Sequence, residues 1–256
     1  MSSEIPESLF EDGWLNEVEH VVSSGKEGTV YCCSSSHRID REFVAVKIYK
    51  PRAFRSFKND AIYTQGRAVG VSVNRFTGVA KPSGAPDRRL ERAIRGGSRI
   101  GRIASESSWT HHEFSTLTSL HRIGARVPRP YTSTNTAIVM DYVGEPDAPA
   151  PKLKDVSFPA DQARAVFRML IDEIELWLSF ERIHGDLSPF NILYWNNKIT
   201  VIDFPQAVSP YENPMAFSLL LRDIENVCRH FPQVADARDP LNIASVLWAR
   251  VVQIPH

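Results

Sequence analysis

Residues 184–203 read His-Gly-Asp-Leu-Ser-Pro-Phe-Asn-Ile-Leu-Tyr-Trp-Asn-Asn-Lys-Ile-Thr-Val-Ile-Asp. The two asparagines at 196–197 separate two short apolar runs, a pattern that predicts a tight β-hairpin. Pairing across this turn sets an antiparallel register that places Asn191 opposite Ile202. We therefore expect Asn191 and Asp203 to emerge at the same end of the hairpin, where both side chains can reach one cation.

The spacing of the polar residues around this hairpin indicates phosphoryl transfer from a nucleotide. Such chemistry needs an Asp that takes or orients the proton of the acceptor hydroxyl, and an Asn and a second Asp that hold Mg²⁺ against phosphate oxygens. Asp186, Asn191 and Asp203 supply these groups in the D-x-x-x-x-N order typical of protein-kinase-like folds. The alternative is a hairpin whose polar ends only cap its strands.

A glycine-bearing turn lies near the N-terminus. Residues 18–22 and 29–33 read as two strands, and 23–28, Ser-Ser-Gly-Lys-Glu-Gly, as the turn between them. The backbone N–H groups of such a turn can point at phosphates, and glycines at 25 and 28 would allow close approach. The alternative is an ordinary glycine turn between strands.

Lys47 is the single cation in the apolar strand 43–49. A buried lysine needs an anion, so we predict that it contacts the α- and β-phosphates of ATP and pairs with Glu113. Glu113 is expected early in a helix whose apolar positions are Phe114, Leu117 and Leu120 and which ends near Gly124 and Pro128. The alternatives are a lysine whose stem reaches the surface of an edge strand and a solvent-facing glutamate.

An apolar run at 138–144 reads as a strand that leads into a hinge. In a kinase-like fold, the backbone at 141–143 would bond the edge of adenine and Met140 would shape the pocket behind it. A plain buried strand with a proline-rich exit is the alternative. After it, a helix beginning near 157–159 has an apolar stripe for core packing, and further helices are expected at about 215–229 and 241–252. The stripe residues are Ala163, Val166, Phe167, Leu170, Ile174, Trp177 and Leu178.

These elements predict an α+β, bilobal, protein-kinase-like fold with two lobes that share a cleft. The N-terminal lobe, 1–143, binds nucleotide and is mainly antiparallel β with one helix and a long mobile loop at about 51–108. The C-terminal lobe, 144–256, is catalytic and mainly helical, with the hairpin inside it. A chain of 256 residues with 43% hydrophobic residues suffices for two such cores.

Four segments together resemble the RIO family of atypical serine/threonine protein kinases, and the resemblance spans almost the whole chain. They are Ser-Ser-Gly-Lys-Glu-Gly-Thr-Val-Tyr at 23–31, Val-Ala-Val-Lys-Ile-Tyr at 44–49, His-Gly-Asp-Leu-Ser-Pro-Phe-Asn-Ile-Leu at 184–193 and Ile-Asp-Phe-Pro-Gln-Ala-Val at 202–208. The S-x-G-K-E phosphate loop and the Gln that ends the metal loop are features of this family.

The resemblance implies an ATP- and Mg²⁺-dependent (or Mn²⁺-dependent) kinase or ATPase that can autophosphorylate and acts on a protein substrate. It implies that Lys47 is the ATP lysine, that Asp186 is the catalytic Asp, and that Asn191 and Asp203 bind the metal. Glu113 completes the predicted catalytic set as the partner of Lys47. The expected nucleotide-binding residues are Ser24, Gly25, Lys26, Glu27, Val30, Lys47, Met140, Tyr142 and Val143. Two other functions stay open: a small-molecule phosphotransferase of the aminoglycoside or choline kinase type, whose signature is similar to 184–191, and a nucleotide-binding scaffold without turnover.

Composition restricts the remaining possibilities. The formal net charge is zero, yet Arg88, Arg92, Arg95, Arg99 and Arg102 recur at helical spacing around Gly96 and Gly97. This segment is either a solvated basic loop or a contact for RNA, the ribosome or an acidic protein. The 3 cysteines show no metal-ligand spacing, and no apolar run reaches membrane-spanning length. We therefore expect a cytoplasmic protein that does not enter a membrane.

Overall fold

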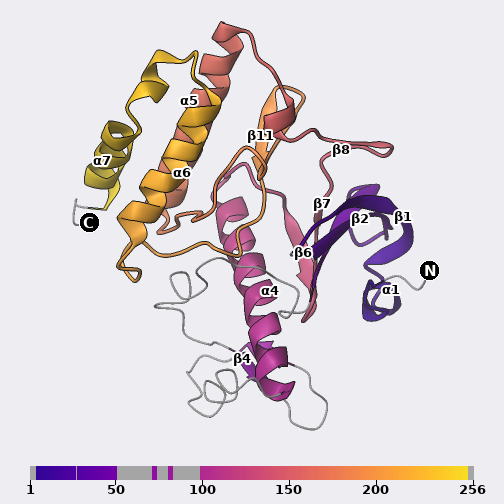
Figure 1. The fold of residues 1–256 in the computed structure, drawn as a ribbon. Coiled ribbons are helices and arrows are strands. Elements are labelled where there is room, and N and C mark those ends of the chain that lie inside the picture. The colour runs from indigo at the N-terminus through magenta and orange to yellow at the C-terminus, as the bar shows by residue number, and fades with distance from the viewer. Residues whose placement is uncertain (1–3, 27, 51–70, 74–79, 83–98, 253–256) are drawn as a thin grey trace. The chain divides into compact units, whose positions relative to one another are not determined.

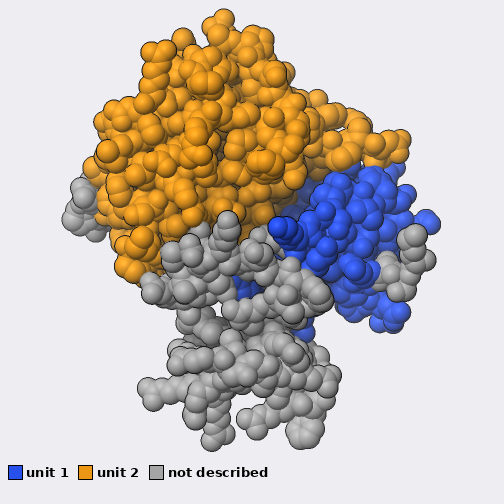
Figure 2. Space-filling view, viewed as in Figure 1, with its two compact units in different colours: residues 1–58, 67–118, 129–142 blue, residues 59–66, 119–128, 143–256 orange. Residues whose placement is uncertain are grey.

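The structure is a computed structural model that describes residues 4–26, 28–50, 71–73, 80–82 and 99–252. The chain forms two compact units (Figure 2). Of the described residues, unit 1 contains 4–26, 28–50, 71–73, 80–82, 99–118 and 129–142, and unit 2 contains 119–128 and 143–252. Residues 119–128, which the sequence assigned to the N-terminal lobe, thus pack with unit 2.

Unit 1 is built on a five-stranded antiparallel sheet in the order β1-β2-β3-β7-β6. Its strands are β1 (Leu15–Ser24), β2 (Gly28–Ser35), β3 (Phe43–Tyr49), β6 (Pro130–Ser133) and β7 (Ala137–Asp141). The central strand β3 is almost entirely buried, since both of its neighbours are strands and its residues are mostly β-branched or aromatic. A separate hairpin consists of β4 (Val71–Val73) and β5 (Ala80–Pro82).

The N-terminal segment belongs to the core of unit 1. A single-turn helix, α1 (Ser8–Glu11), places Leu9 among the buried side chains of the sheet, together with Ile5 and Leu15. Trp14 and Phe10 pack against the same cluster. Burial of a leucine-sized side chain contributes about 1.5–3 kcal/mol, so this segment stabilises the sheet.

The helix that carries Glu113, α4 (Arg99–Arg122), begins earlier than the sequence predicted. The predicted loop at 51–108 therefore overlaps the first ten residues of α4, and Glu113 lies beyond the middle of the helix, not early in it. The apolar spacing marks only part of the helix. Residues 99–112 contain no proline, so the helix can extend through them. Gly124, with φ +81°, terminates it as expected.

Unit 2 is mainly helical. It contains the short strands β8 (Gly144–Glu145) and β9 (Ala148–Pro149), a 3₁₀ turn η2 (Leu153–Asp155), α5 (Ala160–Ser179), the hairpin β10 (Ile192–Trp195) and β11 (Lys198–Val201), α6 (Ala216–His230), η3 (Ala235–Arg238) and α7 (Pro240–Val251). The helices α5, α6 and α7 pack against one another (Figure 1). The whole predicted stripe of α5 is buried, which confirms that it serves core packing.

The segment after α4 is anchored to unit 2 by one buried carboxylate. Glu173 of α5 accepts hydrogen bonds from the backbone N–H of Arg126 at 3.0 Å, from its guanidinium at 2.9 Å and from the indole of Trp177 at 3.1 Å. The Arg126 carbonyl in turn accepts from the Val201 N–H at 2.8 Å. Because these bonds satisfy the buried charge, they explain why 119–128 packs with unit 2.

Candidate active site

Of the described residues, those predicted to bind nucleotide lie in unit 1, apart from Val143, and those predicted to bind the metal lie in unit 2. In unit 1, Lys47 on β3 and Glu113 on α4 form a buried ion pair, with Nζ at 2.8 Å and 2.9 Å from the two carboxylate oxygens. Lys47 is 8% exposed and Glu113 is 1% exposed. Such a pair persists in a low-dielectric interior because each charge satisfies the other. Val30 lies opposite Lys47 on β2.

The turn at 24–28 is closed by its own hydrogen bonds. The Gly25 N–H donates to the Gly28 carbonyl at 2.9 Å, and Lys50 Nζ donates to the Gly25 carbonyl at 2.7 Å. The Ser24 and Thr29 hydroxyls lie 3.3 Å apart. The Gly25 N–H is therefore used within the turn in this structure, and the approach of the turn to phosphate stays a prediction. Lys26 is exposed, and Glu27 lies outside the described residues.

Gly28 is required by the close approach of β3. A Cβ at this position would lie 2.3 Å from the carbonyl oxygen of Ile48 on that neighbouring strand. Close strand pairing thus excludes a side chain at 28, and the approach of this glycine to phosphate stays a prediction. At Gly25 the nearest atom to an added Cβ would be 3.9 Å away, so no such exclusion applies there.

The residues of the predicted hinge lie at and just after the end of β7. Met140 is 7% exposed and pairs with Ala45 on β3. The Asp141 N–H donates to the Arg129 carbonyl, and the Val143 carbonyl accepts from the Ala150 N–H, each at 2.9 Å. Tyr142 and Val143 are half-buried, Tyr142 in unit 1 and Val143 in unit 2.

In unit 2 the hairpin has the predicted register. Trp195 pairs with Lys198, and the turn residues Asn196 and Asn197 have φ of 50° and 59°, as a two-residue hairpin turn with positive φ requires. The Ile202 N–H donates to the Asn191 carbonyl at 2.9 Å, which brings the next residue, Asp203, to the same end as Asn191. Asp203 itself has φ +73°, a backbone conformation uncommon outside glycine.

Asn191 is oriented by backbone carbonyls of the preceding residues 186–188. Its side-chain N–H donates to the Asp186 carbonyl at 3.0 Å, and its backbone N–H donates to the Ser188 carbonyl at 2.9 Å. An amide binds a cation only through its oxygen. Because Nδ2 is held by the Asp186 carbonyl, the side chain is oriented with Oδ1 as the atom that can bind a cation.

The Asp186 carboxylate reaches the surface of unit 2. The surrounding chain still removes enough water to raise its pKa, the Arg222 guanidinium opposes this rise, and the negative charge of Asp203 adds to it. A carboxylate whose pKa is raised accepts a proton more readily, which suits a general base.

His184 connects the backbone of Asp186 to that of Ile202, the residue before Asp203. It is 1% exposed, and its Nε2 lies 3.2 Å from the Ile202 carbonyl, while Nδ1 accepts from the Asp186 N–H at 3.3 Å. Its ring lies 4.5 Å from that of Phe204. These contacts assign His184 a structural role and fix the proton on Nε2.

The sequence analysis did not identify Asp223 on α6, which binds the backbone on both sides of Asp186. Its carboxylate accepts from the backbone N–H groups of Gly185 at 2.7 Å and Leu187 at 2.9 Å. The Arg222 guanidinium donates to the Gly185 carbonyl, and Asn226 Nδ2 donates to the Leu187 carbonyl at 2.9 Å. The available signal was an aspartate inside the apolar stripe of α6, where an unpaired charge would be costly.

Burial raises the pKa of Asp223 to about 7, although the two backbone hydrogen bonds and Arg222 oppose the rise. Asp223 thus keeps both neighbours of Asp186 in place, and it lies close enough to Asp186 for their charges to repel.

The donor set of unit 2 fits Mg²⁺. In the described ranges, no three His, Cys, Asp or Glu side chains gather as a metal site of their own. Mg²⁺ is usually held by one or two protein oxygens together with substrate phosphates and water, and not by a full protein cage. The Asn191 amide oxygen and the Asp203 carboxylate are hard oxygen ligands of this kind, whereas neither is suited to a soft metal.

Comparison with known proteins identifies the family. A family model described as the RIO domain matches residues 85–241. The RIO-type serine/threonine-protein kinase Rio1 of Thermoplasma acidophilum is 30% identical over 200 residues, which are 78% of this chain and 90% of that protein. The serine/threonine-protein kinase RIO1 of Homo sapiens is 28% identical over 233 residues, 89% of this chain but 36% of that protein.

Among solved structures, the Rio2 kinase of Chaetomium thermophilum, in a complex with ADP, Mg²⁺ and phosphoaspartate, aligns with a TM-score of 0.59 at 19% identity, covering 97% of this chain and 70% of that one. This likeness confirms the α+β kinase-like fold. The chain spans 34–39% of the length of its relatives from Caenorhabditis elegans, Homo sapiens and Dictyostelium discoideum. With the RIO domain matched over 157 of 256 residues, from 85 to 241, the chain belongs to the RIO family.

Proposed function

We propose that this chain transfers the γ-phosphoryl group of ATP, with Mg²⁺ (or Mn²⁺), as a serine/threonine kinase or ATPase of the RIO type. The observation that carries the proposal is the hairpin of unit 2, whose register puts Asn191 and Asp203 at one end and ties Asn191 to the backbone of Asp186. Membership of the RIO family and the names of the relatives, which are serine/threonine kinases, support it.

In this proposal Asp186 takes the proton of the attacking hydroxyl. As the proton moves to the carboxylate, the hydroxyl oxygen forms a bond to the γ-phosphorus and the bond from that phosphorus to the ADP oxygen breaks. The acceptor is a protein hydroxyl in the kinase reaction and water in the ATPase reaction. Asp223 and Asn191 keep Asp186 in place through the backbone bonds described above.

The remaining residues neutralise and position the nucleotide. Asn191 and Asp203 would hold Mg²⁺, which supplies positive charge against the phosphate oxygens. Lys47 would contact the α- and β-phosphates while Glu113 keeps its ammonium in place. Ser24, Gly25, Lys26, Glu27 and Val30 would lie toward the nucleotide from the β1–β2 turn and β2, and Met140, Tyr142 and Val143 from the hinge.

A protein is the proposed substrate. An RNA or ribosomal contact through 88–102 stays a prediction, because Arg88, Arg92 and Arg95 lie outside the described residues, while Arg99 and Arg102 fall in the first turn of α4. In the part of the chain that the structure describes, every helix is too short or too polar to span a bilayer. We propose a cytoplasmic location, which the buried free thiols of Cys32, Cys33 and Cys228 support, because free thiols are stable under reducing conditions.

Incubation with γ-labelled ATP and Mg²⁺ tests the function. We expect label on the protein itself or on an added basic protein, or release of labelled phosphate, and about 10²–10⁴-fold less of each with Asp186→Ala. Acid-stable label indicates a phosphorylated hydroxyl, whereas label removed by hydroxylamine indicates an aspartyl phosphate. Transfer only to an aminoglycoside or choline would support the small-molecule phosphotransferase instead. Nucleotide binding without any turnover would support the scaffold.

A further inference from the structure

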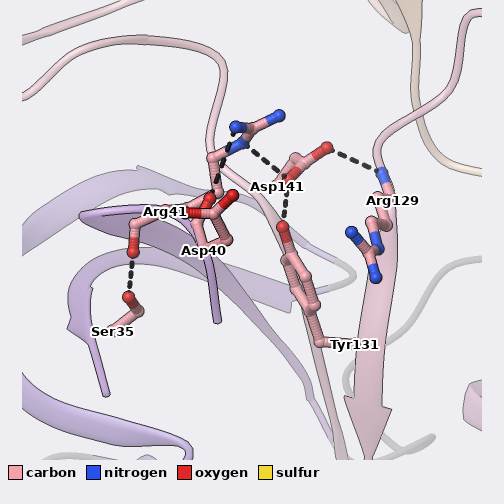
Figure 3. A network of polar contacts seen from close by, with 6 residues as sticks. All are labelled: Ser35, Asp40, Arg41, Arg129, Tyr131 and Asp141. Atoms are coloured by element: carbon pink, nitrogen blue, oxygen red, sulfur yellow. Dashed lines mark hydrogen bonds and ion pairs between the residues drawn. The ribbon is translucent and has the colours of Figure 1, made fainter. Parts of the chain in front are cut away.

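A polar network surrounds Asp141, the last residue of β7 and the first of the three residues predicted to bond adenine (Figure 3). The Asp141 carboxylate accepts from the Tyr131 hydroxyl at 2.6 Å through Oδ1, and from the Arg129 N–H at 3.1 Å through Oδ2. Arg41 Nε lies 3.7 Å from Oδ1. All of these residues belong to unit 1, so the network is complete within one unit.

The contacts that Asp141 makes with Arg41 and Tyr131 differ in strength. The Arg41 side chain is 63% exposed against 23% for Asp141, so water screens this ion pair and its contribution is small. The bond from Tyr131 is short and ends on a charged acceptor, which makes it the stronger contact. Burial, and next the hydrogen bond to Asp141, raise the pKa of Tyr131 above 10, so the phenol stays a donor at all physiological pH values.

The network also connects the loop between β2 and β3 to the end of β7. The Ser35 hydroxyl donates to the Arg41 carbonyl, and Arg41 Nη1 donates to the Asp40 carbonyl at 3.3 Å (Figure 3). The guanidinium of Arg129 lies over the Tyr131 ring, 5.2 Å from its centroid. Asp141 is thus fixed through its side chain in addition to the strand pairing of its backbone.

We propose that Asp141, held by Tyr131, is a positioning residue that sets the path of the following backbone and thereby the recognition of the nucleotide base. The inference rests on the proposed function and deepens it. Hydrogen bonds to both oxygens of the Asp141 carboxylate fix the direction in which the chain leaves β7. The strength of hydrogen bonds between the following backbone and a base depends steeply on this direction. Phosphate and metal contacts, made by Lys47, Asn191 and Asp203, do not involve this network.

The test measures the affinity of the full chain for Mg²⁺-bound ATP, GTP and inorganic tripolyphosphate. The variants are Asp141→Ala, Asp141→Asn, Tyr131→Phe and Arg41→Ala, with Arg38→Ala as control. Arg38 lies in the same loop, 5.4 Å above the ring of Trp14, and outside the network. Tripolyphosphate carries the phosphate contacts without a base, so it separates base recognition from general damage to the site.

We expect Asp141→Ala to weaken ATP binding about tenfold, a loss of about 1.4 kcal/mol, while tripolyphosphate binding changes less than about twofold. The ratio of the affinity for ATP to the affinity for GTP should fall by the same factor. Tyr131→Phe should weaken ATP binding by about threefold, Arg41→Ala by less than about twofold, and Arg38→Ala not at all, following the order of their contacts to Asp141.

Equal losses for ATP and tripolyphosphate in both Asp141 variants would overturn the inference, because they would show a general structural role. Unchanged ATP affinity in folded Asp141→Ala would overturn it as well. If Asp141→Ala does not fold, Asp141→Asn, which keeps the shape and one acceptor oxygen, decides between these outcomes. A wild-type protein that binds neither ATP nor tripolyphosphate would overturn the proposed function itself, a result distinct from either of these.

Discussion

The Lys47 ammonium lies within 2.9 Å of both carboxylate oxygens of Glu113, a residue 66 positions away in the sequence. Both side chains are almost completely buried. Two charges removed from water in this way stabilise each other, and loss of one deprives the other of its oppositely charged partner.

Glu113→Ala should therefore lower the free energy of unfolding by about 3–5 kcal/mol, as for other broken buried pairs, measured by urea denaturation. The double variant Lys47→Met/Glu113→Leu should recover most of this stability, because it removes both charges, yet it should release no phosphate from ATP. Arg250→Ala, which breaks an exposed pair with Glu175, is the control and should cost about 0–1 kcal/mol. An active double variant would exclude Lys47 from the reaction.

The two carboxylates of unit 2 should respond differently to substitution. Asp186→Ala removes the proposed base, so turnover should fall about 10²–10⁴-fold while Mg²⁺-ATP affinity stays near that of the wild type. Asp203→Ala removes a proposed metal ligand and should weaken Mg²⁺-ATP binding itself. Isothermal titration and phosphate release on the same preparations separate the two. Full activity of Asp186→Ala would refute its assignment as base.

Asp223 should make stability depend on pH. Its carboxyl has a pKa near 3.8 when unfolded and about 7 when folded, so between these values the folded protein binds a proton that the unfolded chain has lost. The contribution to stability is present below pH 3.8 and disappears as the pH rises through about 7. In urea denaturation, the free energy of unfolding of the wild type should fall relative to Asp223→Asn over this range. Parallel curves for the two proteins would contradict the assignment.

The glycines of the β1–β2 turn offer a matched pair. Gly28→Ala forces a Cβ to 2.3 Å from the Ile48 carbonyl, so the strands must shift, and we expect a loss of about 1–3 kcal/mol. Gly25→Ala meets nothing closer than 3.9 Å and should change stability by less than about 0.5 kcal/mol. Thermal unfolding of both variants checks this. Equal destabilisation would mean that Gly28 is not distinguished by its contact with β3.

Local signals in the sequence predicted the parts of the site that are built locally. The pair Asn196-Asn197 and the apolar runs beside it fix the turn and the register, so the position of Asp203 relative to Asn191 follows from nearby residues alone. The stripe of α5 was equally readable, because a buried helix face repeats every three to four residues.

Features that depend on distant residues were not predicted. Asp223 acts on backbone groups 36 and 38 residues away, and its place in the apolar stripe of α6 indicates a buried partner without identifying it. The upstream half of α4 has no apolar stripe to mark it. The steric constraint at Gly28 was not predicted either, because the atom that excludes a side chain belongs to β3, whose approach only the sheet defines.

The central claim is that the hairpin of unit 2 presents Asn191 and Asp203 to the metal of a bound nucleotide. The most direct test is a crystal of the full chain with Mn²⁺ and a non-hydrolysable ATP analogue, in which anomalous scattering locates the metal. The account predicts a peak at coordination distance, about 2.1 Å, from the Asn191 amide oxygen and the Asp203 carboxylate. A metal bound elsewhere with the nucleotide, away from both side chains, would contradict it.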